Sequence, residues 1–121
     1  MARLTRIRSW WLSLAAPWRR WRVVGYVAAG DEVPEELPYR GVVLVGRPQR
    51  PAWAALDCPC RSGHRLLVNL DDKRYPHWKI SLQPRLSLWP SIDSVAHGRR
   101  CHFVLSKGTI RWAQDTQEAT A

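Results

Sequence analysis

The chain has 121 residues, a length that suits one domain and leaves little room for a second. Apolar residues make up 45% and charged residues 24%, as in an ordinary globular protein, and the mean hydropathy of -0.36 argues against an integral membrane protein. The sequence has no glycine-rich phosphate loop followed by a lysine, so nothing in it supports nucleotide hydrolysis.

The positive charge of the chain is concentrated towards its two ends. Residues 1–30 carry six Arg and no acid, residues 31–72 carry five basic and seven acidic side chains, and residues 73–121 carry eight basic and three acidic ones. Such a charge distribution attracts nucleic acid, anionic lipid or an acidic protein surface, and its sign alone does not choose among them. A general charge excess that keeps the protein dissolved explains it equally well.

Residues 1–20 form a basic, tryptophan-rich arm in which we expect a short helix. Apolar side chains recur there at separations of three and four, the spacing of one helical face, at Ile7, Trp10, Trp11 and Leu14. Pro17 predicts that this helix ends near Ala16. The helix either makes a peripheral contact with a membrane or a partner, or its Trp side chains cover one edge of a small sheet.

The cysteine content and the start of the chain predict a cytoplasmic protein. Three Cys are an odd and sparse set for a secreted disulfide scaffold, so free thiols or thiolate ligands are expected. The apolar run near the start spans seven residues, 10–16, and is soon followed by Arg19 and Arg20, which makes a poor signal peptide.

From residue 21 onward the pattern changes to short strands. Apolar and β-branched runs, separated by turn residues, lie at 23–27, 41–46, 52–56, 65–70, 77–82, 86–88, 101–105 and 109–112. The last two form a hairpin around Gly108. The sequence therefore predicts a mainly β protein, α+β at most: a small zinc-stabilised antiparallel sheet domain over residues 21–113, with a short N-terminal helix and a disordered tail at 114–121.

A candidate metal site lies around Cys58-Pro59-Cys60. Thiolates are strong zinc ligands, and Cys101 supplies a third one from the other end of the domain. The fourth ligand is either His64 or His102. Neighbouring side chains of a regular strand point to opposite faces, so Cys101 and His102 can share an ion only where the backbone bends, whereas His64 needs only a turn. The alternative is that the cysteines are buried and reduced without a metal.

An ordered set of segments in residues 20–112 resembles a family of small bacterial zinc-binding domains of unknown function, encoded beside ubiquitin-like conjugation systems. The segments that carry the resemblance are Leu37-Pro38, Val43-Leu44-Val45-Gly46, Trp53, Cys58-Pro59-Cys60, Leu67-Val68-Asn69-Leu70, Pro76-His77-Trp78, Ser81-Leu82, Pro90-Ser91-Ile92, His102-Phe103-Val104-Leu105 and Gly108-Thr109-Ile110-Arg111-Trp112. The resemblance implies a zinc-binding β domain that acts as a peptidase on the precursor or conjugate of a ubiquitin-like protein. The resemblance also implies that the partners are the ubiquitin-like protein or its conjugation enzymes.

The chain departs from the family pattern at two places. The family has a Cys-x-Cys-Gly-Cys-Gly run where this chain has Arg61 and Ser62, and a Cys-x-Ser-His-Phe run where this chain has residues 99–103. Cys101 therefore stands at the position of the family's serine. If that serine is a nucleophile, Cys101 replaces it chemically, and if Cys101 is a ligand, the metal coordination is rearranged.

A peptidase nucleophile needs a base within hydrogen-bond reach and a third group that orients the base. The candidates are Ser91 or Cys101 as nucleophile, His102, His97 or His77 as base, and Asp93 as the orienting group. Residues 90–94 equally suit a turn in which the hydroxyls and the carboxylate bond nearby backbone amides. Three Cys and one His would fill a tetrahedral zinc site, which favours a structural metal over a catalytic one.

Two other functions compete with the peptidase. A noncatalytic binding module, with a structural zinc, would use its basic faces and exposed Trp to engage an acidic partner protein. Nucleic-acid binding is the third hypothesis, because Arg alternates with Trp over residues 18–22 and such side chains contact phosphates and stack on bases.

Overall fold

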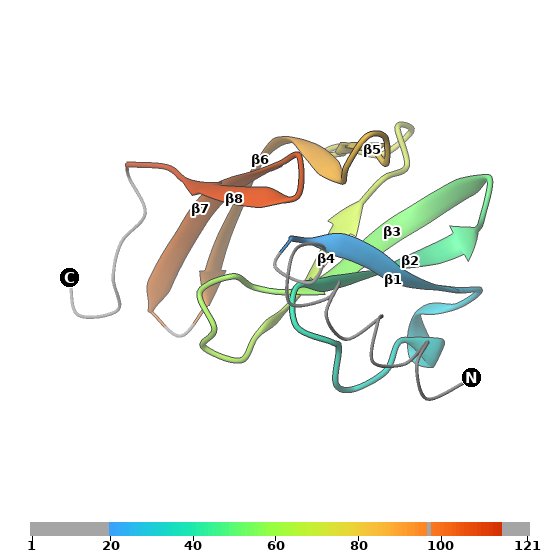
Figure 1. The fold of residues 1–121 in the computed structure, drawn as a ribbon, viewed down its shortest axis with the longest axis horizontal. Coiled ribbons are helices and arrows are strands. Elements are labelled where there is room, and N and C mark those ends of the chain that lie inside the picture. The colour runs from blue at the N-terminus through green and yellow to red at the C-terminus, as the bar shows by residue number, and fades with distance from the viewer. Residues whose placement is uncertain (1–19, 97, 115–121) are drawn as a thin grey trace, which may run out of the picture.

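The computed structural model describes residues 20–96 and 98–114, which form eight β-strands and one short 3-10 helix (Figure 1). The elements are β1 (Arg22–Val27), η2 (Gly30–Glu32), β2 (Gly41–Arg47), β3 (Arg50–Asp57), β4 (Arg65–Asn69), β5 (Lys79–Ser81), β6 (Ser87–Ala96), β7 (Arg99–Ser106) and β8 (Thr109–Trp112). The mainly β prediction is confirmed. The predicted N-terminal helix lies outside the described residues, as does nearly all of the predicted tail, and the domain boundaries stay predictions. Within the described ranges, no helix is long and apolar enough to cross a bilayer.

The strands form two four-stranded sheets, with the orders β1-β2-β3-β4 and β5-β6-β7-β8. All neighbouring pairs are antiparallel except β1 and β2, which run parallel. A parallel pair needs a crossover of about a dozen residues or more, and the acidic connector between Val27 and Gly41 supplies it. The second half of the chain contains only antiparallel neighbours, which short turns can connect.

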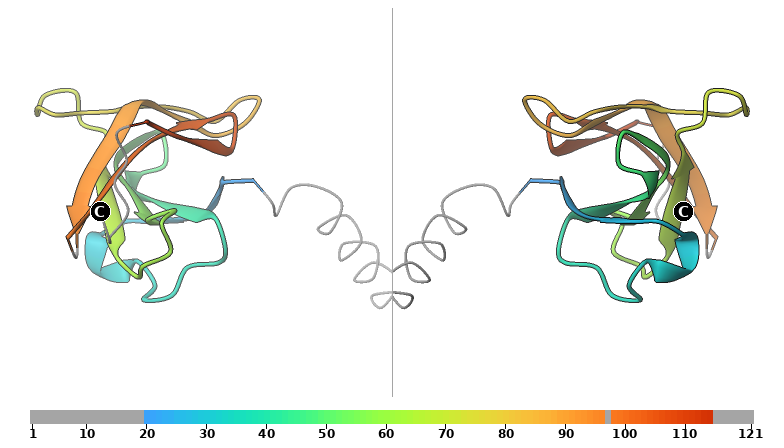
Figure 2. Two further views of the ribbon diagram at one scale, coloured as in Figure 1. Left: turned by 90° about the vertical axis from the view of Figure 1, so that its left-hand side faces the viewer. Right: turned by 90° about the vertical axis from the view of Figure 1, so that its right-hand side faces the viewer.

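The two sheets pack face to face around one core, as the two side views in Figure 2 show. Strand alternation sends every second side chain of β2, β3, β6 and β7 into this space, which is why the buried positions recur with period two in β7. The core contains Trp21, Val42, Leu44, Ala54, Leu56, Cys58, Leu66, Val68, Leu86, Leu88, Ile92, Cys101, Phe103 and Leu105. Two of the three cysteines are therefore part of the interior between the sheets.

Strand β6 is longer than the sequence suggests. The interpretation of residues 90–94 as a turn is wrong, because β6 continues without a break from Ser87 to Ala96. Its register shifts between Leu88 and Ile92, so that four residues of β6 span two of β7. This bulge accommodates Pro90, which has no N–H to give to a regular ladder.

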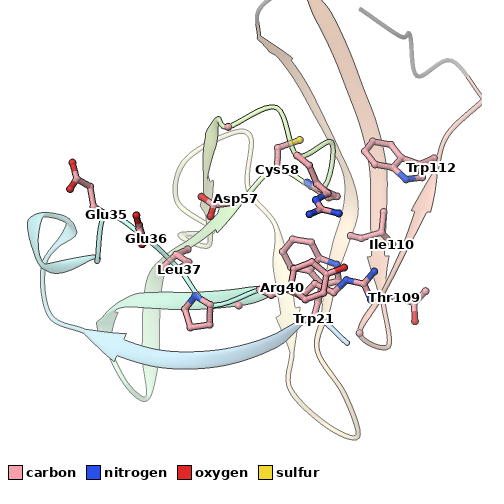
Figure 3. Close-up of a pocket in the computed structure, with 17 residues that line it drawn as sticks. Trp21, Glu35, Glu36, Leu37, Arg40, Asp57, Cys58, Thr109, Ile110 and Trp112 are labelled. Atoms are coloured by element: carbon pink, nitrogen blue, oxygen red, sulfur yellow. The ribbon is translucent and has the colours of Figure 1, made fainter. Parts of the chain in front are cut away.

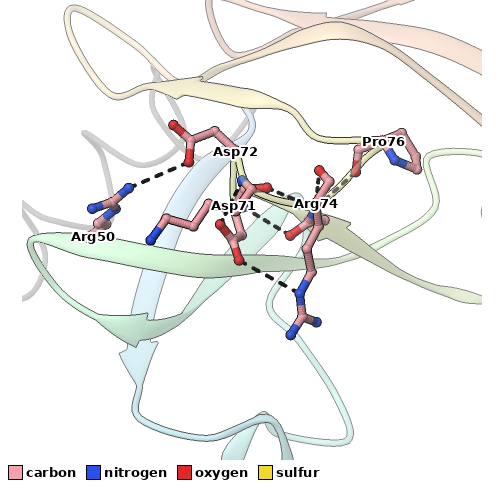
Figure 4. A network of polar contacts seen from close by, with 7 residues as sticks. Arg50, Asp71, Asp72, Arg74 and Pro76 are labelled. Carbon is pink, nitrogen blue, oxygen red and sulfur yellow. Dashed lines mark hydrogen bonds and ion pairs between the residues drawn. The ribbon is translucent and has the colours of Figure 1, made fainter.

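The loop from β4 to β5 carries the chain from one sheet to the other, and a buried asparagine organises it. Asn69 Nδ2 donates to the carbonyls of Asp71, Arg74 and Pro76 at 3.2, 3.3 and 2.9 Å, and its Oδ1 accepts the amide of Asp71 at 3.0 Å. The network is drawn in Figure 4, with two surface ion pairs beside it. The Trp78 amide closes the loop on the carbonyl of Asn69 at 2.8 Å. Asn69 thereby fixes where Trp78 enters the second sheet.

Candidate functional site

Four potential metal ligands meet at one end of the core. One ligand atom from each of Cys58, Cys60, His64 and Cys101 lies within 4.8 Å of the other three. The first three come from the turn between β3 and β4, and Cys101 comes from the middle of β7. This group, called the metal cluster below, could hold one ion between the two sheets.

The turn between β3 and β4 gives the closely spaced cysteines their geometry. The Cys58 amide donates to the His64 carbonyl at 3.0 Å, and the Arg61 amide donates to the Cys58 carbonyl at 3.1 Å. Arg61 and Gly63 have φ values of 62° and 93°, which tightens the chain into a compact turn. At the base of this turn, Arg65 Nε at the start of β4 donates to Asp57 Oδ1 at the end of β3, at 2.8 Å. A spacing of one residue is therefore sufficient to bring both thiols to the same side.

Hydrogen bonds within the turn support the ligand arrangement. Ser62 Oγ lies 2.9 Å from Cys60 Sγ and 3.1 Å from His64 Nδ1. Cys60 Sγ and His64 Nδ1 are 3.7 Å apart. Two such ligands of one tetrahedral zinc ion would be roughly 3.6 Å apart, given metal bonds of about 2.3 and 2.0 Å. Cys60 and His64 thus already have the spacing of two ligands of one ion.

The three thiols differ in acidity. Burial raises the pKa of Cys58 and of Cys101. Burial also acts to raise the pKa of Cys60, but hydrogen bonds with Ser62, Cys58 and Cys101 together outweigh it and lower that pKa to about 7. Cys60 is therefore the thiol that most readily becomes a thiolate, the form in which cysteine binds a metal.

A second group of candidate residues lies on the β5–β8 sheet, on the face opposite to Cys101. Ser91 Oγ of β6 is 2.9 Å from Nε2 of His102 of β7. Asp93 is directly opposite His102 in the ladder. Its carboxylate accepts two hydrogen bonds from Arg100, at 3.0 Å from Nε and 2.7 Å from Nη2. These three candidates, Ser91, His102 and Asp93, are called the outer-face group below.

The charges around Asp93 keep it ionised. The hydrogen bonds from Arg100 lower the pKa of the Asp93 carboxyl, and the positive charge of Arg100 acts in the same direction. Asp93 and Arg100 are partly exposed, so this ion pair faces solvent rather than the core. The sequence places Arg100 near the cysteines and does not indicate its contact with Asp93, although its position two residues before His102 on a strand already puts both on one face.

The bulge in β6 presents Ser91 to His102. The Ser91 carbonyl accepts a hydrogen bond from the indole nitrogen of Trp78 at 3.1 Å, which fixes the backbone at the end of the bulge. Trp78 was also missed, because only the Asn69 loop brings it to β6. No feature of the sequence indicates this contact.

The structure distinguishes the candidates for the fourth metal ligand and for the nucleophile and its base. His64 lies in the metal cluster, whereas His102 lies across the sheet beside Ser91. Cys101 is fully buried on the inner face, away from His102. Its thiol is therefore not in a position to act as a nucleophile with His102 as its base. Among the described residues His77 makes no hydrogen bond to Ser91 or Cys101, and His97 lies outside them.

A cleft of about 740 Å³ opens between the edges of the two sheets (Figure 3). Trp21, Arg40, Ile110 and Trp112 form much of its lining, and Cys58 lies at one side. Neither Ser91 nor His102 lines it. The outer-face group is therefore separate from this cleft, with Asp93 exposed and Ser91 and His102 half-buried.

Comparison with known proteins identifies the family. The family model BubE, described as bacterial ubiquitination-like system serine protease, matches residues 29–113. No curated protein and no solved structure matches the chain significantly. The matched range contains the metal cluster and the outer-face group. Because the match covers more than half of the chain, the resemblance seen in the sequence is confirmed, and the chain belongs to the BubE family of the bacterial ubiquitination-like system.

Proposed function

We propose that the protein is a serine peptidase that cleaves a bacterial ubiquitin-like protein from its precursor or its conjugates. The observation that carries the proposal is the 2.9 Å contact between Ser91 Oγ and His102 Nε2, in a chain whose family is described as a serine protease. A serine hydroxyl becomes a useful nucleophile only when a base within hydrogen-bond distance can take its proton.

In this reaction His102 accepts the proton of the Ser91 hydroxyl while Oγ attacks the scissile carbonyl carbon. The tetrahedral intermediate collapses to an acyl-enzyme, and His102 gives the proton to the leaving amine. A water molecule then attacks the ester, with His102 again taking a proton, and Ser91 is restored. All proton transfers use one imidazole nitrogen, Nε2, which faces Ser91.

Asp93 contributes charge rather than a proton. His102 becomes an imidazolium during the reaction, and a carboxylate opposite it in the ladder stabilises that positive charge. Arg100 holds the carboxylate with two hydrogen bonds, so Asp93 keeps its position and its charge. Arg100 is in this view a positioning residue for Asp93.

The metal cluster is proposed to bind a structural zinc ion. Three Cys and one His complete a tetrahedron, which leaves no position for water or substrate. When bound, the ion would cross-link the turn after β3 to β7. Because His102 follows Cys101 directly, the cross-link also restrains the strand that carries the proposed base.

The test is cleavage of a ubiquitin-like precursor encoded by the same system, followed by mass spectrometry. Ser91→Ala is expected to abolish cleavage, and a small fluorophosphonate should label Ser91 in the unmodified protein. Ser106→Ala, at another half-buried serine of the same sheet, is the matched control and should cleave normally. Cleavage by Ser91→Ala at the normal rate would rule out Ser91 as the nucleophile.

A further inference from the structure

Strand β6 has an open edge just beyond the proposed nucleophile. The short strand β5 pairs only with Ser87–Trp89 of β6. Figure 1 shows β6 and β7 running together well past the end of β5. In the described part of the chain, no strand pairs with this side of β6 from Ser91 to Ala96.

The ladder with β7 shows which backbone groups point to this edge. The His102 carbonyl accepts the Ala113 amide at 2.8 Å, so the backbone groups of His102 point towards β8 and away from β6. Asp93, opposite His102, therefore belongs to a non-hydrogen-bonded pair, and its own N–H and C=O point away from β7. By the alternation of the strand, those of Ser91 and Val95 do the same.

Trp78 provides independent evidence for this direction. It immediately precedes β5, and its indole nitrogen donates to the Ser91 carbonyl at 3.1 Å. That carbonyl therefore faces the side on which β5 lies, as the ladder argument requires. The next backbone groups on this side are those of Asp93 and Val95, which receive no loop or turn hydrogen bond from the described residues.

The edge is accessible and short. The Val95 side chain is 73% exposed, and Asp93 is exposed as well. Asp93 and Val95 together present two N–H and two C=O groups, enough to pair with an extended segment of a few residues. An edge of this kind is a template for a further strand.

We infer that this edge binds the scissile segment of the substrate as an added β-strand, in line with β5 and next to β6. The inference rests on the proposed function and names its substrate: an extended, unpaired stretch of chain at the end of the ubiquitin-like protein. A strand added here lies about 4.8 Å from β6 and pairs with Asp93 and Val95, which brings one end of its main chain next to Ser91. Main-chain pairing holds the segment straight while the Ser91–His102 pair acts on it.

Binding is tested directly by hydrogen exchange, in the full chain carrying Ser91→Ala so that nothing is cleaved. The probe is a ten-residue peptide copied from the C-terminal end of the precursor. When the peptide is bound, the amides of Asp93 and Val95 are expected to exchange at least about tenfold more slowly. The exchange of the amides of the edge strand β1 is expected not to change. Unchanged exchange at both amides under saturating peptide overturns the inference.

A pair of proline variants tests the same edge by kinetics. Val95→Pro removes an N–H that points to the open side, so the β6–β7 ladder loses no hydrogen bond. Leu67→Pro is the matched control. Leu67 is 62% exposed on β4, the edge of the other sheet, and its N–H also points outward because the Asn69 carbonyl two residues later bonds Trp78. Thermal unfolding of both variants checks the fold.

Val95→Pro is expected to lower kcat/KM for the precursor about tenfold, mainly through KM, and Leu67→Pro is expected to cleave normally. Equal cleavage by the two variants overturns the inference. So does protection of the β6 edge by pairing with a second copy of the chain instead of with the peptide. If Ser91→Ala still cleaves, the proposed function fails instead. The exchange experiment then still decides whether a peptide pairs with β6.

Discussion

The two faces of the β5–β8 sheet carry different chemistry within two consecutive residues of β7. Cys101 points inward, is fully buried and joins ligands from the other sheet, whereas His102 points outward and meets Ser91. Strand alternation alone produces this separation. One strand can therefore contribute to the proposed metal site on one face and to the proposed catalytic pair on the other.

The side chains of the metal cluster on the inner face come from distant parts of the sequence. Buried thiols without a metal are weakly interacting groups, whereas an ion bound in the metal cluster would link β7 to the turn after β3. The outer face needs only neighbours on adjacent strands. Damage to the inner face is therefore expected to affect the whole molecule, and damage to the outer face only the reaction.

The largest expected effect is loss of the metal. Cys101→Ser, or removal of the ion with a chelator, should lower the unfolding free energy by several kcal/mol, on the order of the whole stability of a small domain. Elemental analysis and thermal unfolding measure it. Zinc content and unfolding temperature equal to those of the unmodified protein would contradict the structural site.

His102→Ala separates the two faces. It should reduce precursor cleavage by about a thousandfold, because the proton acceptor of Ser91 is lost. Zinc content and thermal unfolding should stay unchanged, since His64 lies in the metal cluster and His102 does not. A His102→Ala protein that loses its metal would place His102 among the ligands after all.

Asn69→Ala tests the loop that connects the sheets. The substitution leaves three loop carbonyls and one amide without their partner, so we expect a loss of about 1–3 kcal/mol in urea unfolding. The control is Asp72→Ala, which removes only an exposed ion pair with Arg50 and should cost less than about 1 kcal/mol. Equal losses for the two variants would show that the Asn69 network adds nothing to stability.

The smallest effect concerns the pH dependence of the outer face. Arg100 lowers the pKa of Asp93 in the folded protein, so the pair stabilises the fold above the ordinary carboxyl pKa of about 4. This contribution is lost as the pH falls through the lowered value. The pair is partly exposed, so its effect should be below about 1 kcal/mol.

The measurement compares the unmodified protein with Arg100→Gln by urea unfolding between pH 6 and about pH 2. The difference between the two stabilities should shrink towards the acid end. A difference that stays constant over that range would show that Asp93 and Arg100 do not interact in solution. Because both proteins contain the metal cluster, acid release of the ion cancels in the comparison.

Much of the fold follows from local pattern. The apolar run at 41–46 and the alternating run at 101–105 are strands because buried faces impose these patterns. The grouping of Cys58 and Cys60 with Cys101 also follows from residue type. The choice of His64 over His102 as the neighbour of these thiols needed only the alternation of a strand.

The remaining features depend on long-range geometry. The residues of β1 are typical of a strand, but nothing in them specifies a parallel neighbour. Residues 90–94 contain proline, two serines and aspartate, which suit a turn locally; pairing with β7 makes them a strand. The contact of Ser91 with His102 depends on that pairing and on the size of the bulge, so the sequence offered it only as one combination among several.

The adjacency of Cys101 and His102 also restricts how the gene can change. Inserting or deleting a single residue within β7, between Arg99 and Cys101, would shift the following residues by one position and exchange the inward and outward side chains. The thiol would then reach solvent and the imidazole would enter the core. Length variation in this family is therefore expected to avoid this part of β7 and to accumulate in exposed connectors such as residues 28–40.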